Sequence, residues 1–300
     1  MSYWRYPYHT QPLRRAKYQL IEKIGEGANG QVYKARSDDN VVVAIKYLAH
    51  ADPKSRERFQ NEVRIYLKLQ ACPFVVKILD FSLDPLAPFL VMEFCKSGNA
   101  RSQHAWFINN SRDGIRLLLG IADAVGRFHD LDTYHRDIKP DNLLMDTDLF
   151  RNFTLKLGDA GMSCLLPDQG SFLNATYSLQ GTPTYIAPEL LQGETFSAAS
   201  DVFSLGVTMH ELLAGERPHA GQRIISGPLA MQNLIQRMID RNPRNRPTIH
   251  ETIAGMNAAF HQISAKQNIN EFVGGTLKAG ALLGGILIGI SALDYLLEGE

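Results

Sequence analysis

The stretch TYHRDIKPDNLL, residues 133–144, gathers charged side chains, a proline and an asparagine between two apolar runs. A loop that only reversed the chain would not need so many polar groups in one place. The stretch therefore raises two alternatives, a reactive site and a polar loop without a site.

The composition leaves the function to be read from such a local site. The chain has 300 residues, enough for one large domain or two modest ones. Lys and Arg together number 31, as do Asp and Glu, so no excess of positive charge indicates nucleic acid as a partner. Cys72, Cys95 and Cys164 are far apart and odd in number, which favours buried free thiols and a reducing compartment.

Strand patterns come first along the chain and helical patterns follow. Early segments alternate or run apolar and β-branched, whereas later segments repeat apolar residues at intervals of three and four. This order predicts an α+β protein with a small β-rich lobe and a larger α-helical lobe. Strands are expected within residues 18–49, 74–83 and 88–94, and helices over residues 54–69, 113–131 and 200–215.

The segment GEGANGQV, residues 25–32, carries glycines between two predicted strands. Without a Cβ, the backbone N–H groups of Gly25, Gly27 and Gly30 can approach a polyphosphate closely. An ordinary hairpin would also tolerate these glycines, so the segment is weak evidence by itself. A dinucleotide-binding fold is disfavoured because a strand, and not a helix, follows the glycines.

Lys46 ends the apolar strand VAIK, where an ammonium group is costly unless an anion meets it. A solvated surface lysine is the alternative. Glu62 on the following helix is the preferred partner, because it shares a helical side with Phe59 and Tyr66. Glu57 is the rival partner on the same helix.

At HRDIKPDN the sequence resembles the protein kinase family, and the order of segments matches that family over residues 18–260. The resemblance implies that Asp137 is the catalytic base and that Lys139 steadies the transferred phosphoryl group. It also implies that Asn142 and Asp159 hold a metal ion. His135 and Arg136 would have structural and regulatory roles.

The same resemblance implies a nucleotide site. Gly25, Gly27 and Gly30 would cover the phosphates, and Lys46 with Glu62 would form the ion pair that orders the nucleotide. The segment from Glu93 to Cys95 would recognise adenine through its backbone. Met92 would be the gatekeeper, and the adenine ring would lie between Val32, Ala44 and Leu144, although these three fit equally well as plain core.

The segment LGDAGMS departs from the family, which has Asp-Phe-Gly where this chain has Asp159, Ala160 and Gly161. Asp159 can still chelate magnesium. The missing ring leaves a gap in the packing between His135 and the helix that carries Glu62. Tyr66, one turn after Glu62, is expected to fill part of that gap.

The later segments imply structural and regulatory roles. Thr182 in GTPTYIAPE and Lys139 resemble serine/threonine kinases, and Arg136 would pair with a phosphate carried by Ser171, Thr176 or Ser178. Asp201 would be a buried anchor for the catalytic loop. Glu189 would pair with Arg246. The short connection between residues 215–222 and 230–239 implies that the docking helix usual in the family is absent or a single turn.

The C-terminal tail has a different character. Residues 279–293 are apolar and uncharged, about 22 Å of helix at about 1.5 Å per residue. If Lys278 and Asp294 snorkel, a transmembrane helix over about residues 276–297 becomes long enough. Glycine pairs within this segment favour helix contact, hence homodimerisation. The alternative is an apolar helix packed on the kinase lobe, with a cytoplasmic protein.

These observations predict a two-lobed protein kinase fold with a C-terminal hydrophobic helix. We expect an N-terminal arm over residues 1–17, a kinase domain over 18–262, and a linker and tail over 263–300. The kinase domain consists of a smaller lobe over residues 18–95 and a larger lobe over residues 96–262. The expected reaction transfers the γ-phosphoryl group of ATP to Ser or Thr hydroxyls of proteins, with Mg²⁺, or alternatively Mn²⁺. We expect an autophosphorylating enzyme that is anchored to the membrane, with its kinase domain in the cytoplasm. Two alternatives are a nucleotide-binding pseudokinase scaffold and a kinase of small molecules or lipids.

Overall fold

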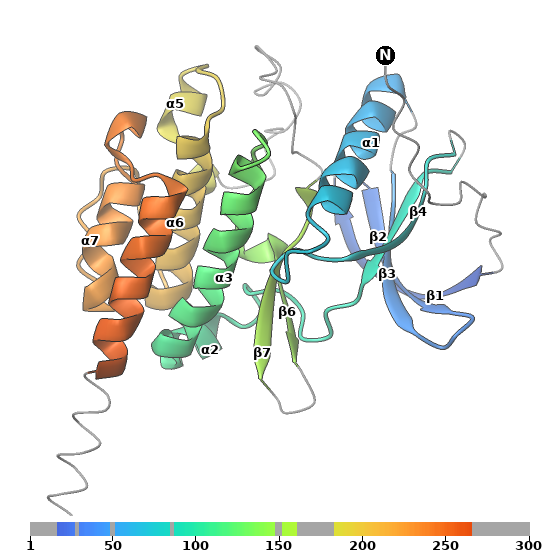
Figure 1. The fold of residues 1–300 in the computed structure, drawn as a ribbon, viewed down its shortest axis with the longest axis horizontal. Coiled ribbons are helices and arrows are strands. Elements are labelled where there is room, and N and C mark those ends of the chain that lie inside the picture. Colours follow the sequence, from blue (N-terminus) through green and yellow to red (C-terminus); the bar gives the residue numbers. More distant parts are fainter. Residues whose placement is uncertain are drawn as a thin grey trace, which may run out of the picture.

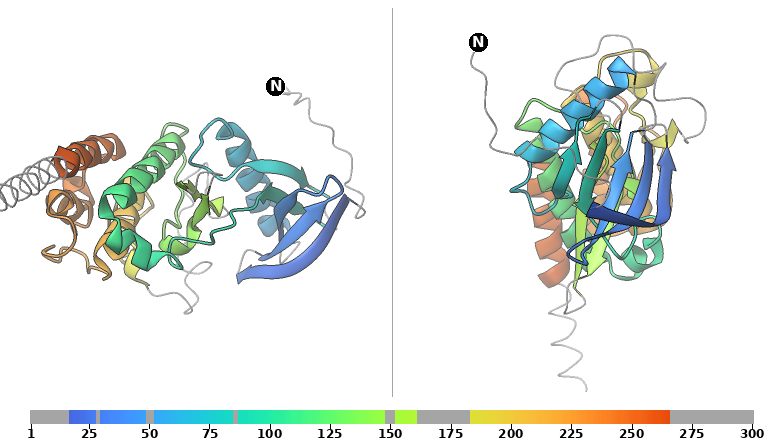
Figure 2. Two further views of the ribbon diagram at one scale, coloured as in Figure 1. Left: turned by 90° about the horizontal axis from the view of Figure 1, so that it is seen from below. Right: turned by 90° about the vertical axis from the view of Figure 1, so that its right-hand side faces the viewer.

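The computed structural model describes residues 17–27, 30–48, 52–84, 87–147, 152–160 and 183–265. Two lobes lie side by side, a sheet with one helix and a larger bundle of helices (Figure 1). The two-lobed α+β architecture that the order of segments predicted is therefore confirmed. Two further views show the strands of the smaller lobe curving away from the helices of the larger one (Figure 2).

The smaller lobe is a five-stranded antiparallel sheet in the order β1-β2-β3-β5-β4. Helix α1 follows β3 in sequence and packs beside β4. The elements are β1 (Tyr18–Gly27), β2 (Gly30–Ser37), β3 (Val42–Tyr47), α1 (Pro53–Lys68), β4 (Ile78–Ser82) and β5 (Phe89–Glu93).

Alternation along β3 places two kinds of side chain on opposite faces of the sheet. Val43 and Ile45 join a small apolar cluster with Ala35 and Val91. Lys46 points the other way, toward α1. Because both faces of β3 are covered, the strand is buried along most of its length, and its one lysine must find its partner inside the protein.

The larger lobe begins after β5 and contains mainly helices. Its central helix α6 is buried on nearly all sides, and its neighbours include α2, α3 and α7. The elements are α2 (His104–Asn109), α3 (Ser111–His129), β6 (Leu143–Thr147), β7 (Phe153–Leu157), α5 (Pro188–Leu191), α6 (Ala198–Ala214), α7 (Leu229–Met238) and a helix over residues 249–265.

Glycine lets α6 and α7 approach closely. A Cβ placed on Gly206 of α6 would lie only 2.8 Å from Cβ of Met238 at the end of α7. Helix α6 begins at the capping box of Ser197 and Ser200 and ends at Gly215, whose φ of 86° suits a residue without a side chain. These signals fix the helix that later holds the catalytic loop.

The connection between α6 and α7 contains no helix, as the sequence predicted. Residues 215–228 form turns and irregular structure. His210 of α6 secures this connection, because its ring nitrogens bond the carbonyl oxygen of Glu216 at 2.8 Å and Oγ of Ser226 at 3.1 Å. Any docking surface on this side of the lobe must therefore differ from one built on an additional helix.

The expectations about the cysteines and the membrane span can be checked only for the described residues. Cys72 and Cys95 are buried free thiols, as predicted, whereas Cys164 lies outside the described residues. Within the described ranges, no helix combines the length and the apolar character that a membrane span requires. The proposed span over residues 276–297 lies outside those ranges.

A buried ion pair joins the C-terminal part of the larger lobe to the segment before α6. The guanidinium of Arg246 donates to both carboxylate oxygens of Glu189, at 2.8 and 2.7 Å. Burial by itself raises the pKa of Glu189, but the hydrogen bonds and charge of Arg246 outweigh burial and hold the pKa below its ordinary value. The pairing that the resemblance implied is confirmed.

We expect Arg246→Ala to destabilise the protein by about 3–5 kcal/mol, because it leaves the carboxylate of Glu189 buried without its ionic partner. Arg244→Ala is the matched control, because Arg244 is exposed and two residues away. Urea denaturation followed by circular dichroism measures both variants. Equal midpoints for the two variants would show that the ion pair contributes nothing to stability.

Candidate active site

The segment of residues 133–142 lies between α3 and β6 and is held from beneath by α6. Oδ2 of Asp201 accepts a hydrogen bond from the backbone N–H of His135, and Oδ1 accepts one from Arg136, both at 2.9 Å. Asp201 is completely buried. The anchoring role implied for Asp201 is confirmed.

His135 links this loop to the segment that carries Asp159. Its Nδ1 accepts from the backbone N–H of Asp137 at 3.4 Å, and its Nε2 lies 3.0 Å from the carbonyl oxygen of Gly158. This pattern assigns the proton of a neutral imidazole to Nε2. Burial lowers the pKa of His135, which favours the same neutral form.

Asp137, Lys139 and Asn142 form one hydrogen-bonded group. Nζ of Lys139 lies 2.8 Å from each carboxylate oxygen of Asp137. Nδ2 of Asn142 donates to the carbonyl oxygen of Asp137 at 2.7 Å and to its Oδ2 at 2.9 Å. The three residues implied for catalysis and metal binding are thus brought together, with the carboxylate of Asp137 partly open to solvent.

Lys46 is shared by two carboxylates from different lobes. Its Nζ lies 2.7 Å from Oε1 of Glu62 on α1 and 2.8 Å from Oδ1 of Asp159 beyond β7. Glu57 is exposed on another side of α1. The preference for Glu62 over Glu57 is confirmed, and the alternative of a solvated surface lysine is excluded. Sequence reasoning missed the second partner, because Asp159 is distant in the chain.

Asp159 has the properties of a metal ligand. Burial by itself raises its pKa, but the charge and hydrogen bond of Lys46 prevail and lower the pKa to about 2. The side chain is 38% exposed, so part of the carboxylate remains open to solvent. Its φ of 53° lies in the left-handed region that L-residues rarely adopt, a strain often found at functional sites.

The backbone of Asn142 contacts the residue that precedes Asp159. The carbonyl oxygen of Asn142 accepts from the backbone N–H of Gly158 at 2.9 Å. Because Nδ2 of Asn142 is used by Asp137, its Oδ1 is the side-chain atom left for a metal. A carboxylate oxygen and an amide oxygen are hard donors that suit Mg²⁺, which also keeps water or phosphate ligands. The residues present therefore fit the cation that the sequence implied.

The residues implied for nucleotide binding lie mainly on three adjacent strands. Gly25 and Gly27 belong to β1 and Gly30 begins β2, while residues 28–29 between them lie outside the described ranges. Val32 pairs with both Gly25 and Lys46 in the sheet, and Ala44 pairs with Met92. Leu144 belongs to β6 of the other lobe and lies close to Gly158. The adenine-binding role of Val32, Ala44 and Leu144 stays a prediction.

The connection between the lobes is stabilised by an ion pair that sequence reasoning did not predict. Nζ of Lys156 on β7 lies 2.6 and 2.7 Å from the two carboxylate oxygens of Glu93. Oε1 of Glu93 also accepts from the backbone N–H of Lys77 at 2.8 Å. Burial, followed by the charge of Glu93, raises the pKa of the Cys95 thiol to about 12, so Cys95 is neutral.

Tyr66 reaches Ala160, as the sequence analysis expected. The tyrosine is 1% exposed, and its hydroxyl accepts a hydrogen bond from the backbone N–H of Ala160 at 3.2 Å. Burial and then the charge of Glu62 raise the pKa of Tyr66, so the hydroxyl keeps its proton. Tyrosine therefore supplies both volume and a directed polar contact next to Asp159. The hydrogen bond was not foreseen.

The predicted regulatory residues lie mostly outside the described ranges. Gly161, Ser171, Thr176, Ser178 and Thr182 fall within residues 161–182. Arg136 is described, and its guanidinium lies 5.4 Å from the centre of the Phe196 ring. The pairing of Arg136 with a phosphate stays a prediction.

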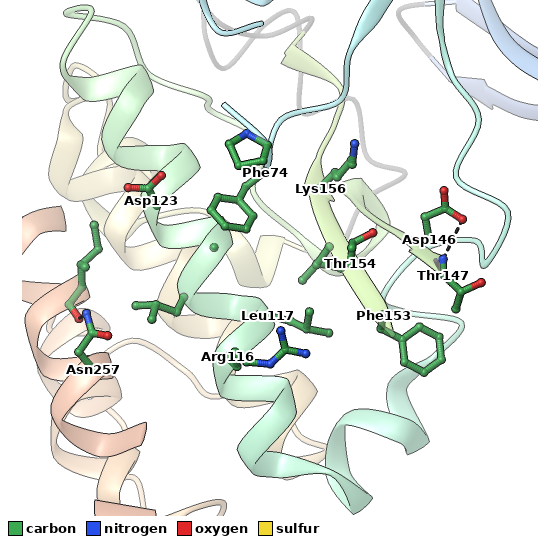
Figure 3. Close-up of a pocket in the computed structure, with 15 residues that line it drawn as sticks. Phe74, Arg116, Leu117, Asp123, Asp146, Thr147, Phe153, Thr154, Lys156 and Asn257 are labelled. Atoms are coloured by element: carbon green, nitrogen blue, oxygen red, sulfur yellow. Dashed lines mark hydrogen bonds between the residues drawn. The ribbon is translucent and has the colours of Figure 1, made fainter. Parts of the chain in front are cut away.

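A separate cavity of about 720 Å³ lies away from this site (Figure 3). Residues from α3, β6, β7 and the helix of residues 249–265 line it, among them Phe74, Arg116, Phe153 and Asn257. None of the residues predicted to bind nucleotide, metal or phosphoryl group belongs to its lining. The cavity is therefore not the place where the predicted chemistry would occur.

The fold and the geometry around Asp137, Lys46 and Asp159 define a protein kinase. The family described as the protein kinase domain matches residues 18–256, and the chain belongs to that family. The recognition made from HRDIKPDN is thereby confirmed.

Similar proteins come from bacteria, plants and animals. Serine/threonine-protein kinase A of Synechocystis sp. is 28% identical over 83% of this chain and 54% of its own length. CBL-interacting serine/threonine-protein kinase 24 of Arabidopsis thaliana is 33% identical over 79% of this chain and 56% of its length. Human serine/threonine-protein kinase ULK3 is 30% identical over 81% of this chain and 55% of its own length. The chain thus spans about half the length of these curated relatives.

We expect Tyr66→Ala to cost about 3–5 kcal/mol of stability, because it empties a large buried volume. It should also lower the rate of ATP turnover, since the contact with Ala160 lies next to Asp159. Tyr66→Phe keeps the ring and should have a smaller effect. Thermal unfolding and a coupled ATPase assay measure these effects.

Tyr33→Phe is the matched control, because the hydroxyl of Tyr33 bonds Gln31 on the sheet surface. Adding Ala160→Phe to Tyr66→Ala should restore part of the stability, because it returns an aromatic ring to the same region. If Tyr66→Ala left both stability and turnover unchanged, Tyr66 would not fill the gap beside Ala160.

Proposed function

We propose that this chain is a protein serine/threonine kinase that transfers the γ-phosphoryl group of ATP to Ser or Thr hydroxyls. The observation that carries the proposal is the position of Lys46, which joins Glu62 of one lobe to Asp159 of the other. Asp137, Lys139 and Asn142 complete the set of charged and amide groups that phosphoryl transfer needs.

Asp137 is the group that accepts the proton of the attacking hydroxyl. As the hydroxyl oxygen bonds to the γ-phosphorus, the bond from that phosphorus to the β–γ bridging oxygen breaks, and ADP leaves. Lys139, now paired with Asp137, is placed to neutralise charge on the transferred group. Lys46 is placed to hold the other phosphates while Glu62 fixes its ammonium.

Asp159 and Asn142 would hold Mg²⁺, which supplies charge neutralisation at the phosphates when bound. Carboxylate and amide oxygens would also accept Mn²⁺. The pKa of about 2 keeps Asp159 ionised over the physiological range, so its affinity for a cation does not depend on deprotonation there.

Two alternatives are less well supported. A nucleotide-binding pseudokinase would not need the charged residues of the cleft to be positioned together, and Tyr66 compensates for the absence of a ring at Ala160. A kinase of small molecules or lipids is disfavoured by the segment GTPTYIAPE, which resembles that of kinases acting on proteins, and by relatives named serine/threonine-protein kinases.

We expect Asp137→Asn to lower kcat for phosphorylation of a generic Ser/Thr protein substrate by at least about 100-fold, because the general base is lost. Asp39→Asn, which changes an exposed aspartate in the turn between β2 and β3, is the matched control. Transfer of label from γ-labelled ATP measures the rate. Label found only on phosphate or on lipid would reject the protein substrate class, and a wild-type protein that binds ATP without turnover would favour the pseudokinase.

We further propose that the C-terminal segment anchors the kinase to a membrane, with the catalytic domain on the cytoplasmic side. The uncharged run of residues 279–293 supports insertion, and Lys266 and Lys278 before it support the orientation. Glycine pairs in that run support pairing of two such helices, which would raise the effective concentration for autophosphorylation. Phosphate on Ser171, Thr176 or Ser178 would then attract Arg136.

Full-length protein should remain in the membrane fraction after a carbonate wash, and protein truncated at Phe272 should become soluble. The apolar run is the physical reason, because its transfer from water into lipid is favourable. Substituting two leucines of the run by lysine provides a control of unchanged length. Full-length protein that stays soluble and monomeric without detergent would show that the tail packs on its own kinase lobe.

A further inference from the structure

A cluster of charged side chains lies next to the catalytic loop but takes no part in the chemistry proposed above. At its centre is Arg101, which lies between β5 and α2. Nε and Nη2 of Arg101 donate to Oδ1 and Oδ2 of Asp141 at 2.8 and 2.7 Å. Nη1 donates to Oε1 of Glu211 on α6 at 2.7 Å. One guanidinium therefore satisfies two carboxylates from distant parts of the chain.

Tyr185 and Arg217 complete this cluster, which we call the Arg101 cluster. The hydroxyl of Tyr185 accepts from Nη2 of Arg101 at 2.8 Å and donates to Oε2 of Glu211. Nε of Arg217 lies 3.1 Å from Oε1 of Glu211, and its guanidinium lies over the Tyr185 ring. The two carboxylates are thus matched by two guanidinium groups, and the cluster carries no net charge.

Arg101 supplies one of the two positive charges that face the carboxylates of the cluster, and Arg217 supplies the other. Burial, followed by the hydrogen bond to Glu211, raises the pKa of Tyr185 to about 12. Removal of Arg101 would leave the carboxylates of Asp141 and Glu211 facing one arginine, Arg217.

The cluster adjoins the loop that carries Asp137. Asp141 immediately precedes Asn142, whose amide contacts the carboxylate of Asp137 at 2.9 Å. Thr208 of α6, one turn before Glu211, bonds the carbonyl oxygen of Ile138 in the same loop. An extended peptide advances about 3.3 Å per residue, so neighbours a few positions from the acceptor can reach these carboxylates.

The cluster is also accessible enough to meet a substrate. The side chains of Arg101 and Asp141 are 33% and 40% exposed, whereas Glu211 is 8% exposed. A purely structural guanidinium would be expected to lie deeper, as Arg246 does. An arginine supplied by a substrate could make the same forked contact with Asp141, because the fork matches a carboxylate from either source.

We infer that Arg101 determines substrate specificity by occupying the site where two carboxylates would otherwise bind a basic residue of the substrate. The inference rests on the proposed protein kinase function. With Arg101 in place, both carboxylates are already paired, so an arginine close to the acceptor gains no carboxylate partner. The kinase therefore selects acceptor serines or threonines without a nearby basic residue, and the loss of Arg101 makes nearby arginine favourable.

The test compares peptides that differ only in one residue. A neutral serine peptide is made with a single arginine scanned through about four positions on either side of the acceptor. The measured quantity is the ratio of kcat/KM for each arginine peptide to kcat/KM for the neutral peptide. This ratio does not depend on the fraction of enzyme that is active, so partial loss of folding does not distort it.

Wild-type enzyme should give a ratio at or below one at every position. Arg101→Ala should raise the ratio about tenfold or more at one or two positions, the effect of one charge-assisted contact. Adding Asp141→Asn should abolish most of this gain, because the forked partner is lost. Arg217→Ala is the matched control and should produce a smaller rise, because Arg101 still covers both carboxylates.

Binding measurements separate this inference from the proposed function. Fluorescence anisotropy gives the ratio of Kd values for the same peptides in the presence of a non-hydrolysable ATP analogue, even if no peptide is phosphorylated. Arg101→Gln replaces Arg101→Ala if the alanine variant does not fold. An unchanged ratio in the Arg101 variant, or a wild-type enzyme that already prefers arginine peptides, would overturn the inference. Absent turnover with a changed Kd ratio would overturn only the proposed function.

Discussion

The buried carboxylate of Asp201 is the constraint on which the catalytic site depends. It lies inside the larger lobe at the start of α6 and accepts hydrogen bonds from two consecutive backbone N–H groups of the catalytic loop, with His129 at 3.1 Å as a further neighbour. A buried carboxylate left without donors would be very costly. The loop must therefore adopt the conformation that brings its amides to Asp201. Arg136 keeps a φ of 71° in that conformation, which local preferences would oppose.

The second constraint is that the two lobes share one ammonium group. Lys46 comes from the sheet, Glu62 from α1 and Asp159 from the segment after β7. With Glu62 and Lys46 both buried, the pair is stable only while its geometry is good, because few water molecules can replace a lost contact. A movement of α1 away from Lys46 would leave charge without a partner on both sides. The orientation of α1 is therefore coupled to the orientation of the metal-binding carboxylate.

Sequence reasoning located most of the fold and the groups at the centre of the site. The strands of the smaller lobe, α1, α3 and α6 follow from periodicity, whereas β6 and β7 were not predicted. Glu62 is preferred over Glu57 because it shares a side with Phe59 and Tyr66. These inferences succeeded because they depend on spacing within one element. The roles of Asp137, Asn142 and Asp201 came from the resemblance and not from spacing.

Contacts between distant segments could not be predicted in the same way. Arg101 meets Asp141 and Glu211 across 40 and 110 residues, and no local pattern distinguishes it from a solvated arginine. The ion pair of Lys156 with Glu93 is similar, because each residue lies on its own short strand and the fold alone brings them together. A long charged side chain can reach several partners, so the packing of the elements that carry these residues determines which ion pair forms.

Ala160 and Tyr66 show how a departure in sequence can preserve the coupling between α1 and Asp159. A phenylalanine next to Asp159 would contact α1 through apolar surface alone, which tolerates sliding. Here the large side chain belongs to α1, and its hydroxyl bonds the backbone N–H of Ala160 at 3.2 Å. A hydrogen bond is directional, so rotation of α1 must break it together with the ion pair of Lys46 and Glu62, one turn away on the same helix. Because a buried N–H left without an acceptor is itself costly, the exchange of ring for hydroxyl holds the helix by geometry as well as by volume.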